Sequence, residues 1–267
     1  MKKPRLAIPV TIAIVAAMLA ATLTPTRAQD GGAEMKEAAP IPEASIPSYI
    51  IAAVNSPARP AADKALDAGR KPAQMLAFFG IKPGMKVVDL SAGGGYTTEL
   101  LSLVVGPEGK VYSQNPNLAR FAKMLAAWHA RVKNLSNVVA IEKPADVPNL
   151  LPVGPDSIDA AIINMNYHDL VHAGLNMDRM NKTIFTDLKK GGVYGVIDNS
   201  AQAGSGARDA GTLHRIDENF VIKQVEAAGF KLDAASSALR NPRDDRTWPI
   251  FKHRGQQDRF MLKFVKP

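Results

Sequence analysis

The sequence contains no cysteine in its 267 residues. Disulfide bonds, cysteine nucleophiles and thiolate metal ligands are therefore excluded. It also shows no internal repeat, so nothing indicates a repeat architecture. What the chain does have is a hydrophobic content of 46%, which at this length is sufficient for the core of one large α/β domain.

The first residues have the pattern of a secretory signal. Lys2, Lys3 and Arg5 precede an uncharged apolar run over residues 6–23, and small residues follow up to Ala28. This pattern predicts a signal peptide over residues 1–28 that is cleaved, giving a periplasmic or secreted protein without a stable membrane anchor. An uncleaved anchor is the alternative, because the run comes close to the roughly 18 residues that span a bilayer.

The basic character of the chain depends partly on this signal. Residues 1–28 carry four basic residues and no acidic one, so their removal lowers the formal net charge from +8 to +4. A modest surplus spread along the chain favours solubility and does not indicate a nucleic-acid groove. We therefore expect no nucleic-acid partner. The expected partner is a small-molecule substrate, and the sequence does not indicate an oligomeric state.

The rest of the chain divides by composition. Residues 29–58 are rich in Ala, Pro, Gly, Ser and Glu, with one short apolar cluster at 49–51, which predicts a flexible arm. Residues 59–267 alternate helical and strand-like segments, as in a parallel sheet covered by helices. We expect strands at 86–90, 110–114, 138–142, 158–164, 193–198, 231–236 and 258–265, and helices at 72–79, 96–105, 118–132, 176–188 and 214–228.

This order predicts a Rossmann-like α/β fold with a seven-stranded, mostly parallel sheet and helices on both faces. Ligands of such sheets bind at the carboxyl ends of the strands. The turn at 91–95 after the first strand contains three consecutive glycines, which allow a ligand to approach backbone N–H groups. A dinucleotide fingerprint fits poorly, because Ser91 and Thr98 occupy its first and third glycine positions.

The same stretch resembles motif I of class I S-adenosylmethionine-dependent methyltransferases, which is an acidic residue followed by small-x-Gly-x-Gly. The matching positions are Asp89, Ser91, Gly93 and Gly95. The lead-in at 81–85 is similar to that of protein-isoaspartate and transfer-RNA adenine methyltransferases.

Over residues 60–267 the pattern also resembles a group of exported bacterial predicted methyltransferases. The similar segments are 166–169, 214–217 and 258–260. The resemblance covers nearly the whole chain after the signal and implies S-adenosylmethionine as cofactor.

It also implies roles for single residues. Asp89 would hold the glycine turn and contact the amino-acid part of the cofactor, with Ser91, Gly93, Gly95 and Tyr96 beside it.

Two further cofactor positions come from the next strands. The acidic residue that normally binds the ribose hydroxyls is replaced by Gln114 and Asn115, whose neutral amides are weaker acceptors than a carboxylate. Asp146 follows the third strand, where such folds often contact the adenine amino group. Its alternative role is a helix N-cap before Pro148.

The end of the fourth strand would face the transferred methyl group. There Asn164 and Tyr167 resemble part of the Asn-Pro-Pro-Tyr motif of amino-group methyltransferases, without its prolines. His168 is the candidate general base, because a neutral imidazole accepts a proton from a nucleophile. The alternative is a histidine that only shapes the loop through hydrogen bonds.

Other polar residues allow weaker hypotheses. His168 and His172 would share a helical face beside Asp169, with His214 or Asp217 as a third ligand, but two histidines without a clear third ligand predict no metal site. Arg215 is a candidate partner for an acidic substrate group.

The segment 241–248 is polar, as in a substrate lid or in a hairpin loop held by its own ion pairs.

These observations predict an enzyme that transfers a methyl group from S-adenosylmethionine to an unidentified small-molecule or protein acceptor. The first alternative is a non-catalytic periplasmic ligand-binding protein on the same fold, favoured by the missing carboxylate after the second strand. A metal-dependent hydrolase that uses His168, His172 and His214 is a weaker third hypothesis.

Overall fold

Seven strands form one sheet in the order β3-β2-β1-β4-β5-β7-β6. Strands β1 to β5 run parallel, and β7 runs antiparallel to both β5 and β6. This arrangement confirms the predicted fold class. The strands are β1 (Lys86–Leu90), β2 (Lys110–Asn115), β3 (Val138–Glu142), β4 (Ile158–Asn164), β5 (Leu188–Asn199), β6 (Lys231–Ala235) and β7 (Arg259–Val265).

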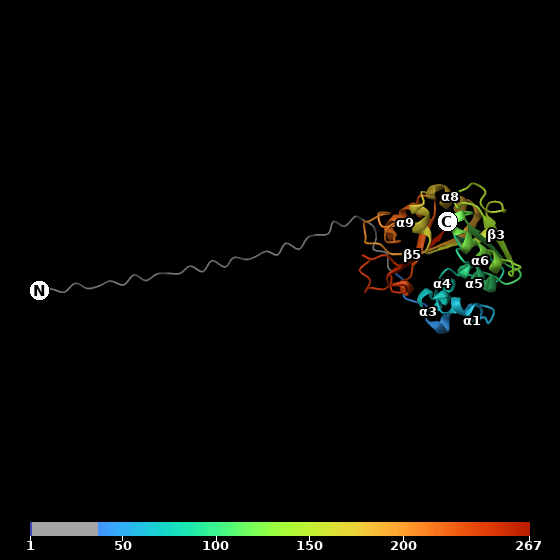
Figure 1. Cartoon of the computed structure of the whole chain (residues 1–267), viewed down its shortest axis with the longest axis horizontal. Helices are drawn as coiled ribbons and strands as arrows, with labels where there is room; N and C mark the ends of the chain where they lie inside the picture. Colours follow the sequence, from blue (N-terminus) through green and yellow to red (C-terminus); the bar gives the residue numbers. More distant parts are fainter. Residues whose placement is uncertain (2–36) are drawn as a thin grey trace. The chain divides into compact units, whose positions relative to one another are not determined.

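Helices cover both faces of this sheet (Figure 1). Side chains alternate along each strand, so Val87 packs in one core cluster and its neighbour Val88 in the other. The cluster of Val87 contains residues of α1 (Ser48–Asn55), α4 (Pro72–Phe78) and α5 (Tyr96–Val105). The cluster of Val88 contains residues of α7 (Tyr167–His172), α8 (Met177–Asp187) and α9 (Glu218–Glu226).

Shorter elements complete the fold. Helix α6 (Ala122–Val132) buries Trp128 in a small cluster of its own. The remaining elements are α2 (Ala61–Lys64), α3 (Asp67–Arg70), and the 3-10 turns η1 (Glu43–Ser45), η2 (Ala119–Phe121) and η3 (Ser237–Leu239).

The computed structural model describes Met1 and residues 37–267. The predicted signal peptide over 1–28 and the first part of the predicted arm lie outside the described residues. None of the described helices is long and apolar enough to span a membrane.

The described part of the predicted arm differs from the expectation of a flexible segment. Ile46, Ile50 and Ala53 are buried in the core beneath α1, and Ile50 has an exposed fraction of 0%. Ile50 and Ala53 are three residues apart and so lie on one side of α1, and Ile46 precedes the helix. The surrounding alanines and prolines hide this pattern, so the folded domain extends toward the N-terminus beyond the predicted boundary at residue 59.

Helix α9 also begins later than predicted. The expected start at His214 is prevented by a left-handed backbone, with φ of 54° at that residue. Asp217 is instead the N-cap, because its carboxylate accepts a hydrogen bond from the Asn219 backbone N–H at 3.0 Å. His214 therefore lies in the loop that precedes the helix.

Candidate functional site

A cavity of 360 Å³ lies against the glycine turn between β1 and α5. The turn holds Ser91, Gly93 and Gly95 with φ of 51°, 58° and 84°. Side chains added at Gly93 or Gly94 would meet no atom within 4 Å. The backbone here is thus open to a ligand, as the sequence predicts.

Asp89 lies at the base of this cavity with an exposed fraction of 1%. Its Oδ2 accepts a hydrogen bond from Thr98 Oγ1 at 2.6 Å, while its Oδ1 is buried without a partner. Burial raises the pKa of Asp89 to about 7, against the opposing effect of the Thr98 hydrogen bonds.

These features fit the amino-acid end of S-adenosylmethionine. A buried carboxylate oxygen without a partner provides an acceptor for an ammonium group. The open glycine backbone at the start of α5 provides donors for a carboxylate.

The amides that replace the ribose-binding carboxylate have a different role from the predicted one. Gln114 Oε1 accepts from the Ser91 N–H at 2.9 Å, and Asn115 Oδ1 accepts from the Gly93 N–H at 2.9 Å. Asn115 also donates to the Gly93 carbonyl, and Gln114 donates to the Lys143 carbonyl. Because an amide donates and accepts at once, each side chain ties the glycine turn to the end of β2.

Short helices line the other side of the same cavity. Tyr96 Oη donates to Asp67 Oδ1 at 2.6 Å, and Asp67 forms a bidentate ion pair with Arg59 at 2.7 Å. Arg131 of α6 pairs with Asp63 of α2. Residues of α2 and α3 are thus held to the sheet domain by polar contacts above the glycine turn.

Asp146 lies apart from these contacts. Its Oδ2 accepts from the Asn176 backbone N–H at 3.0 Å, so it supports the start of α8.

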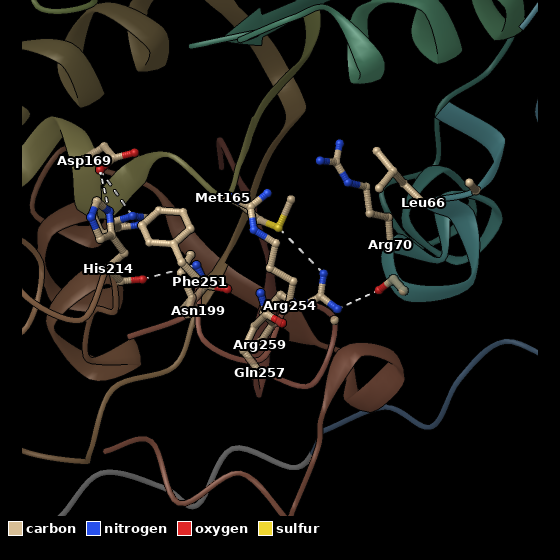
Figure 2. A pocket seen from close by; sticks show the side chains of 15 residues that line it. Leu66, Arg70, Met165, Asp169, Asn199, His214, Phe251, Arg254, Gln257 and Arg259 are labelled. Atoms are coloured by element: carbon tan, nitrogen blue, oxygen red, sulfur yellow. Dashed lines mark hydrogen bonds and ion pairs between the residues drawn. The ribbon is translucent and has the colours of Figure 1, made fainter. Parts of the chain in front are cut away.

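A second cavity, of 420 Å³, shares part of its lining with the first, and Figure 2 shows the side chains that line it. Leu66, Arg70 and Met165 line both cavities. Met165 follows β4 with a left-handed φ of 60°, which is strained for a residue with a side chain. Because the two cavities share this wall, a ligand in one cavity would lie next to a ligand in the other.

The second cavity is rich in arginine. Arg70, Arg254 and Arg259 line it, and none of them occurs in an ion pair among residues 37–267. Arg259 has an exposed fraction of 6%, and its guanidinium donates to the Gly69 carbonyl at 2.6 Å and contacts Met165 Sδ at 3.6 Å. Burial lowers the pKa of Arg259 to about 10, helped by the charge of Arg70, so it remains a cation at neutral pH.

His168 lies at another wall of this cavity, in α7. Its Nδ1 is 2.7 Å from Asp198 Oδ1, and its Nε2 is 3.3 Å from Asp169 Oδ1. Burial lowers the pKa of His168, but the Asp198 and Asp169 carboxylates outweigh it and raise the pKa to about 10. In the ligand-free protein this shift favours the protonated imidazole, which opposes the predicted role as general base.

The other two predicted catalytic residues, Asn164 and Tyr167, lie in different parts of the structure. Asn164 lines the first cavity and donates to Thr97 Oγ1 at 3.2 Å. Tyr167 is fully buried between α7, α8 and α9, where its hydroxyl contacts Gln224 and Asn181. Tyr167 therefore packs in the core.

The structure also disagrees with two weaker hypotheses, which concern His172 and Arg215. The ring of His172 lies against Gly211, so His172 is not part of the cluster formed by His168, Asp169 and His214. Arg215 is fully buried and pairs with Asp244 at 2.8 Å, which leaves it no access to a substrate.

Comparison with known proteins agrees with the geometry of the glycine turn. The family model described as "Protein-L-isoaspartate(D-aspartate) O-methyltransferase (PCMT)" matches residues 50–227, which is more than half of the chain. The chain belongs to the PCMT family. Its enzyme class is therefore that of the S-adenosylmethionine-dependent class I methyltransferases, as predicted.

Individual relatives are distant. The ubiquinone/menaquinone biosynthesis C-methyltransferase UbiE of Pasteurella multocida is 28% identical over 121 residues, which span 45% of this chain and 42% of that protein. A SAM-dependent methyltransferase from Aquifex aeolicus has a TM-score of 0.56 at 19% identity, covering 77% of this chain and 95% of its own. An arsenic(III) S-adenosylmethionine methyltransferase from Chlamydomonas reinhardtii has a TM-score of 0.53 at 17% identity, covering 82% and 73%. These structures share the fold.

The sequence analysis did not identify the arginines of the second cavity. Arg70 and Arg259 are far apart in the chain, and their position in one cavity arises only when β7 inserts next to β5. Asp198 was also missed, although it lies near the carboxyl end of β5, where a parallel sheet places ligand-binding groups.

Proposed function

We propose that this protein transfers a methyl group from S-adenosylmethionine to a carboxylate oxygen of an acceptor held in the 420 Å³ cavity. The observation that carries the proposal is Arg259, a buried cation that has no carboxylate partner among residues 37–267. A buried charge is costly unless it is paired. An anionic acceptor would supply the missing negative charge.

The family description agrees with this acceptor chemistry. It names O-methylation of L-isoaspartate and D-aspartate in proteins, and both residues present a free carboxylate. Arg70 and Arg254 line the same cavity, and a guanidinium matches the geometry of a carboxylate.

The cofactor would be held by the first cavity. Asp89 Oδ1 would accept the ammonium group, and the N–H group of Gly94 would face its carboxylate, since the Gly93 N–H already donates to Asn115. When bound, S-adenosylmethionine supplies an electrophilic methyl group on a sulfonium. Arg70 and Met165, which line both cavities, would keep the two ligands adjacent.

A carboxylate acceptor also removes the need for a general base. Its oxygen carries no proton at neutral pH, so no side chain has to accept one. The contribution of the protein is then chiefly to position the two ligands and to exclude water.

The first test is calorimetric titration with S-adenosylhomocysteine, followed by transfer of a tritiated methyl group to an isoaspartyl peptide or to succinate. We expect binding at micromolar strength, about −8 kcal/mol, and a product whose label is released by alkali, as a methyl ester requires. Absence of binding, or an alkali-stable product, would contradict the proposal.

Two pairs of variants separate the cavities. Gly94→Leu fills the open space of the first cavity and should weaken S-adenosylhomocysteine binding at least tenfold, whereas Gly154→Leu, at an equally open glycine elsewhere, should not. Arg259→Met should lower kcat/KM for the acceptor at least tenfold while leaving S-adenosylhomocysteine affinity unchanged. Lys263→Met on the same strand, which removes an ion pair with Asp233, is its control.

A further inference from the structure

Three side chains converge at the wall of the second cavity that α7 forms. The ligand atoms offered by His168, Asp169 and His214 all lie within 4.8 Å of one another. Asp169 Oδ1 is 3.3 Å from His168 Nε2 and 3.2 Å from His214 Nδ1. Figure 2 shows the Asp169 carboxylate and the His214 ring pointing toward each other.

These separations match those of metal ligands. Nitrogen and oxygen donors about 2.0–2.2 Å from a tetrahedral ion lie about 3.3–3.5 Å apart. The two nitrogen–oxygen separations therefore already suit ligands of one ion, and the two imidazole nitrogens lie within 4.8 Å of each other.

His168 is also oriented as a metal ligand. Its Nδ1 lies 2.7 Å from the fully buried Asp198 carboxylate, which also accepts from the His168 backbone N–H at 2.8 Å. Histidines that bind metals commonly donate their second ring N–H to a carboxylate, which fixes the ring and directs the other nitrogen to the ion. A bound ion would displace the proton that this nitrogen carries in the ion-free protein.

The remaining nitrogen of this ring is not satisfied by a hydrogen bond. His168 has an exposed fraction of 1%, and among residues 37–267 its buried Nε2 makes no well-aligned hydrogen bond, although Asp169 Oδ1 lies 3.3 Å away as an ion-pair partner. Asn199 Oδ1 is likewise buried without a partner and belongs to the lining of the same cavity. Such groups are rare in folded proteins because each is costly, so the cluster has unfilled coordination capacity.

The backbone of His214 supports the same conclusion. Its φ of 54° is left-handed, a conformation that is unfavourable for a residue with a side chain. Asn199 Nδ2 donates to the His214 carbonyl at 3.2 Å and helps to hold this conformation. The strained backbone presents the His214 ring to Asp169.

From this geometry we propose that His168, Asp169 and His214 form a binding site for one divalent transition-metal ion, with its open positions toward the 420 Å³ cavity. Two imidazoles and one carboxylate suit zinc, iron or cobalt better than magnesium or calcium, which prefer oxygen ligands. This differs from the expectation from the sequence, in which the third ligand was not evident. The proposal does not depend on methyl transfer.

The test is a titration of the untagged, chelator-treated protein with Co²⁺, followed by visible absorption, and with Zn²⁺, followed by calorimetry. We expect one ion per chain with a Kd of micromolar or below, and a cobalt d–d spectrum that Zn²⁺ abolishes. Neither S-adenosylmethionine nor an acceptor is present, so failure here is distinct from failure of the proposed methyl transfer.

Variants assign the ligands. His214→Gln and Asp169→Asn change partly exposed residues and should each weaken Co²⁺ binding at least tenfold with an unchanged circular dichroism spectrum. His172→Gln is the matched control, because His172 lies near the cluster in sequence but its ring contacts Gly211. Asp198→Asn, a change at a positioning residue, should weaken binding and shift the cobalt spectrum.

Absence of a bound ion would overturn the proposal and assign the short distances to hydrogen bonds alone. Binding that survives both His214→Gln and Asp169→Asn, or that is lost to the same degree in His172→Gln, would overturn it as well.

Discussion

At the scale of single residues, Asp89 links pH to cofactor binding. Its pKa is raised to about 7 by burial, so the carboxyl group is mostly protonated at pH 6 in the ligand-free protein. An ammonium group binds the ionised form, so the affinity for S-adenosylhomocysteine should rise by up to tenfold per pH unit below pH 7 and level off above it. Calorimetry at pH 6 in buffers of different ionisation enthalpy should show release of nearly one proton.

The control is Asp89→Asn, which keeps a partner for Thr98 but does not ionise. Its affinity should be lower and nearly independent of pH between 6 and 8. A pH dependence that persists in Asp89→Asn would show that Asp89 is not the group responsible. In the ligand-free wild type the raised pKa has the opposite consequence, because the free energy of unfolding loses a contribution as the pH rises from about 4 to 7.

Single residues also show which parts of the site could be predicted from the sequence. Asp89, Ser91 and Gly93 were predicted at the cofactor cavity and line it, because a ligand-binding turn after the first strand is a local feature. The bonding of Gln114 and Asn115 to the turn was not predictable, since an amide binds a backbone group as readily as a ribose hydroxyl.

At the scale of elements, the loop between η3 and β7 depends on one buried ion pair. Arg215 and Asp244 are both fully buried at their side chains and lie 2.8 Å apart, and the Arg215 guanidinium stacks on Trp248 with its carbon 4.5 Å from the ring centroid. Asp244 Oδ2 also accepts from the Asp258 backbone N–H. The loop that carries Phe251 into the second cavity is therefore anchored by a pair of charges beneath it.

Asp244→Asn should lower the free energy of unfolding by about 3–5 kcal/mol, because it leaves the Arg215 charge buried without its partner. Urea denaturation measures this loss. Lys189→Met, which removes an exposed ion pair with Asp159, should cost no more than about 1 kcal/mol. Equal losses in the two variants would show that the buried pair does not anchor the loop.

The order and direction of the elements were largely predictable, and their boundaries less so. The apolar run of β4 and the alternation of helices and strands are local sequence patterns, so the seven-stranded sheet could be predicted from the sequence. Helix α1 was not predicted, because the burial of Ile50 and Ala53 depends on their packing against α4 and α5. The burial of Arg259 is also a property of the assembled sheet.

At the scale of the whole molecule, α2 and α3 lie where the two cavities meet. Leu66 and Arg70 line both cavities, and these helices have four residues each. They contribute no fully buried side chain, and polar contacts such as Asp67 with Tyr96 and Asp63 with Arg131 attach them. Segments with few buried apolar contacts open at low free-energy cost, so this wall is the expected route of ligand entry.

Ligand binding should therefore slow exchange selectively in this wall. We expect backbone amides of residues 61–70 to exchange hydrogen at least tenfold more slowly with saturating S-adenosylhomocysteine, because a ligand in the first cavity contacts both the wall and the glycine turn. Helix α9 packs on the opposite face of the sheet and should keep its exchange rates under conditions where local opening dominates. Unchanged exchange at 61–70, in a sample that calorimetry shows to be saturated, would mean that the ligand does not occupy the cavity beneath these helices.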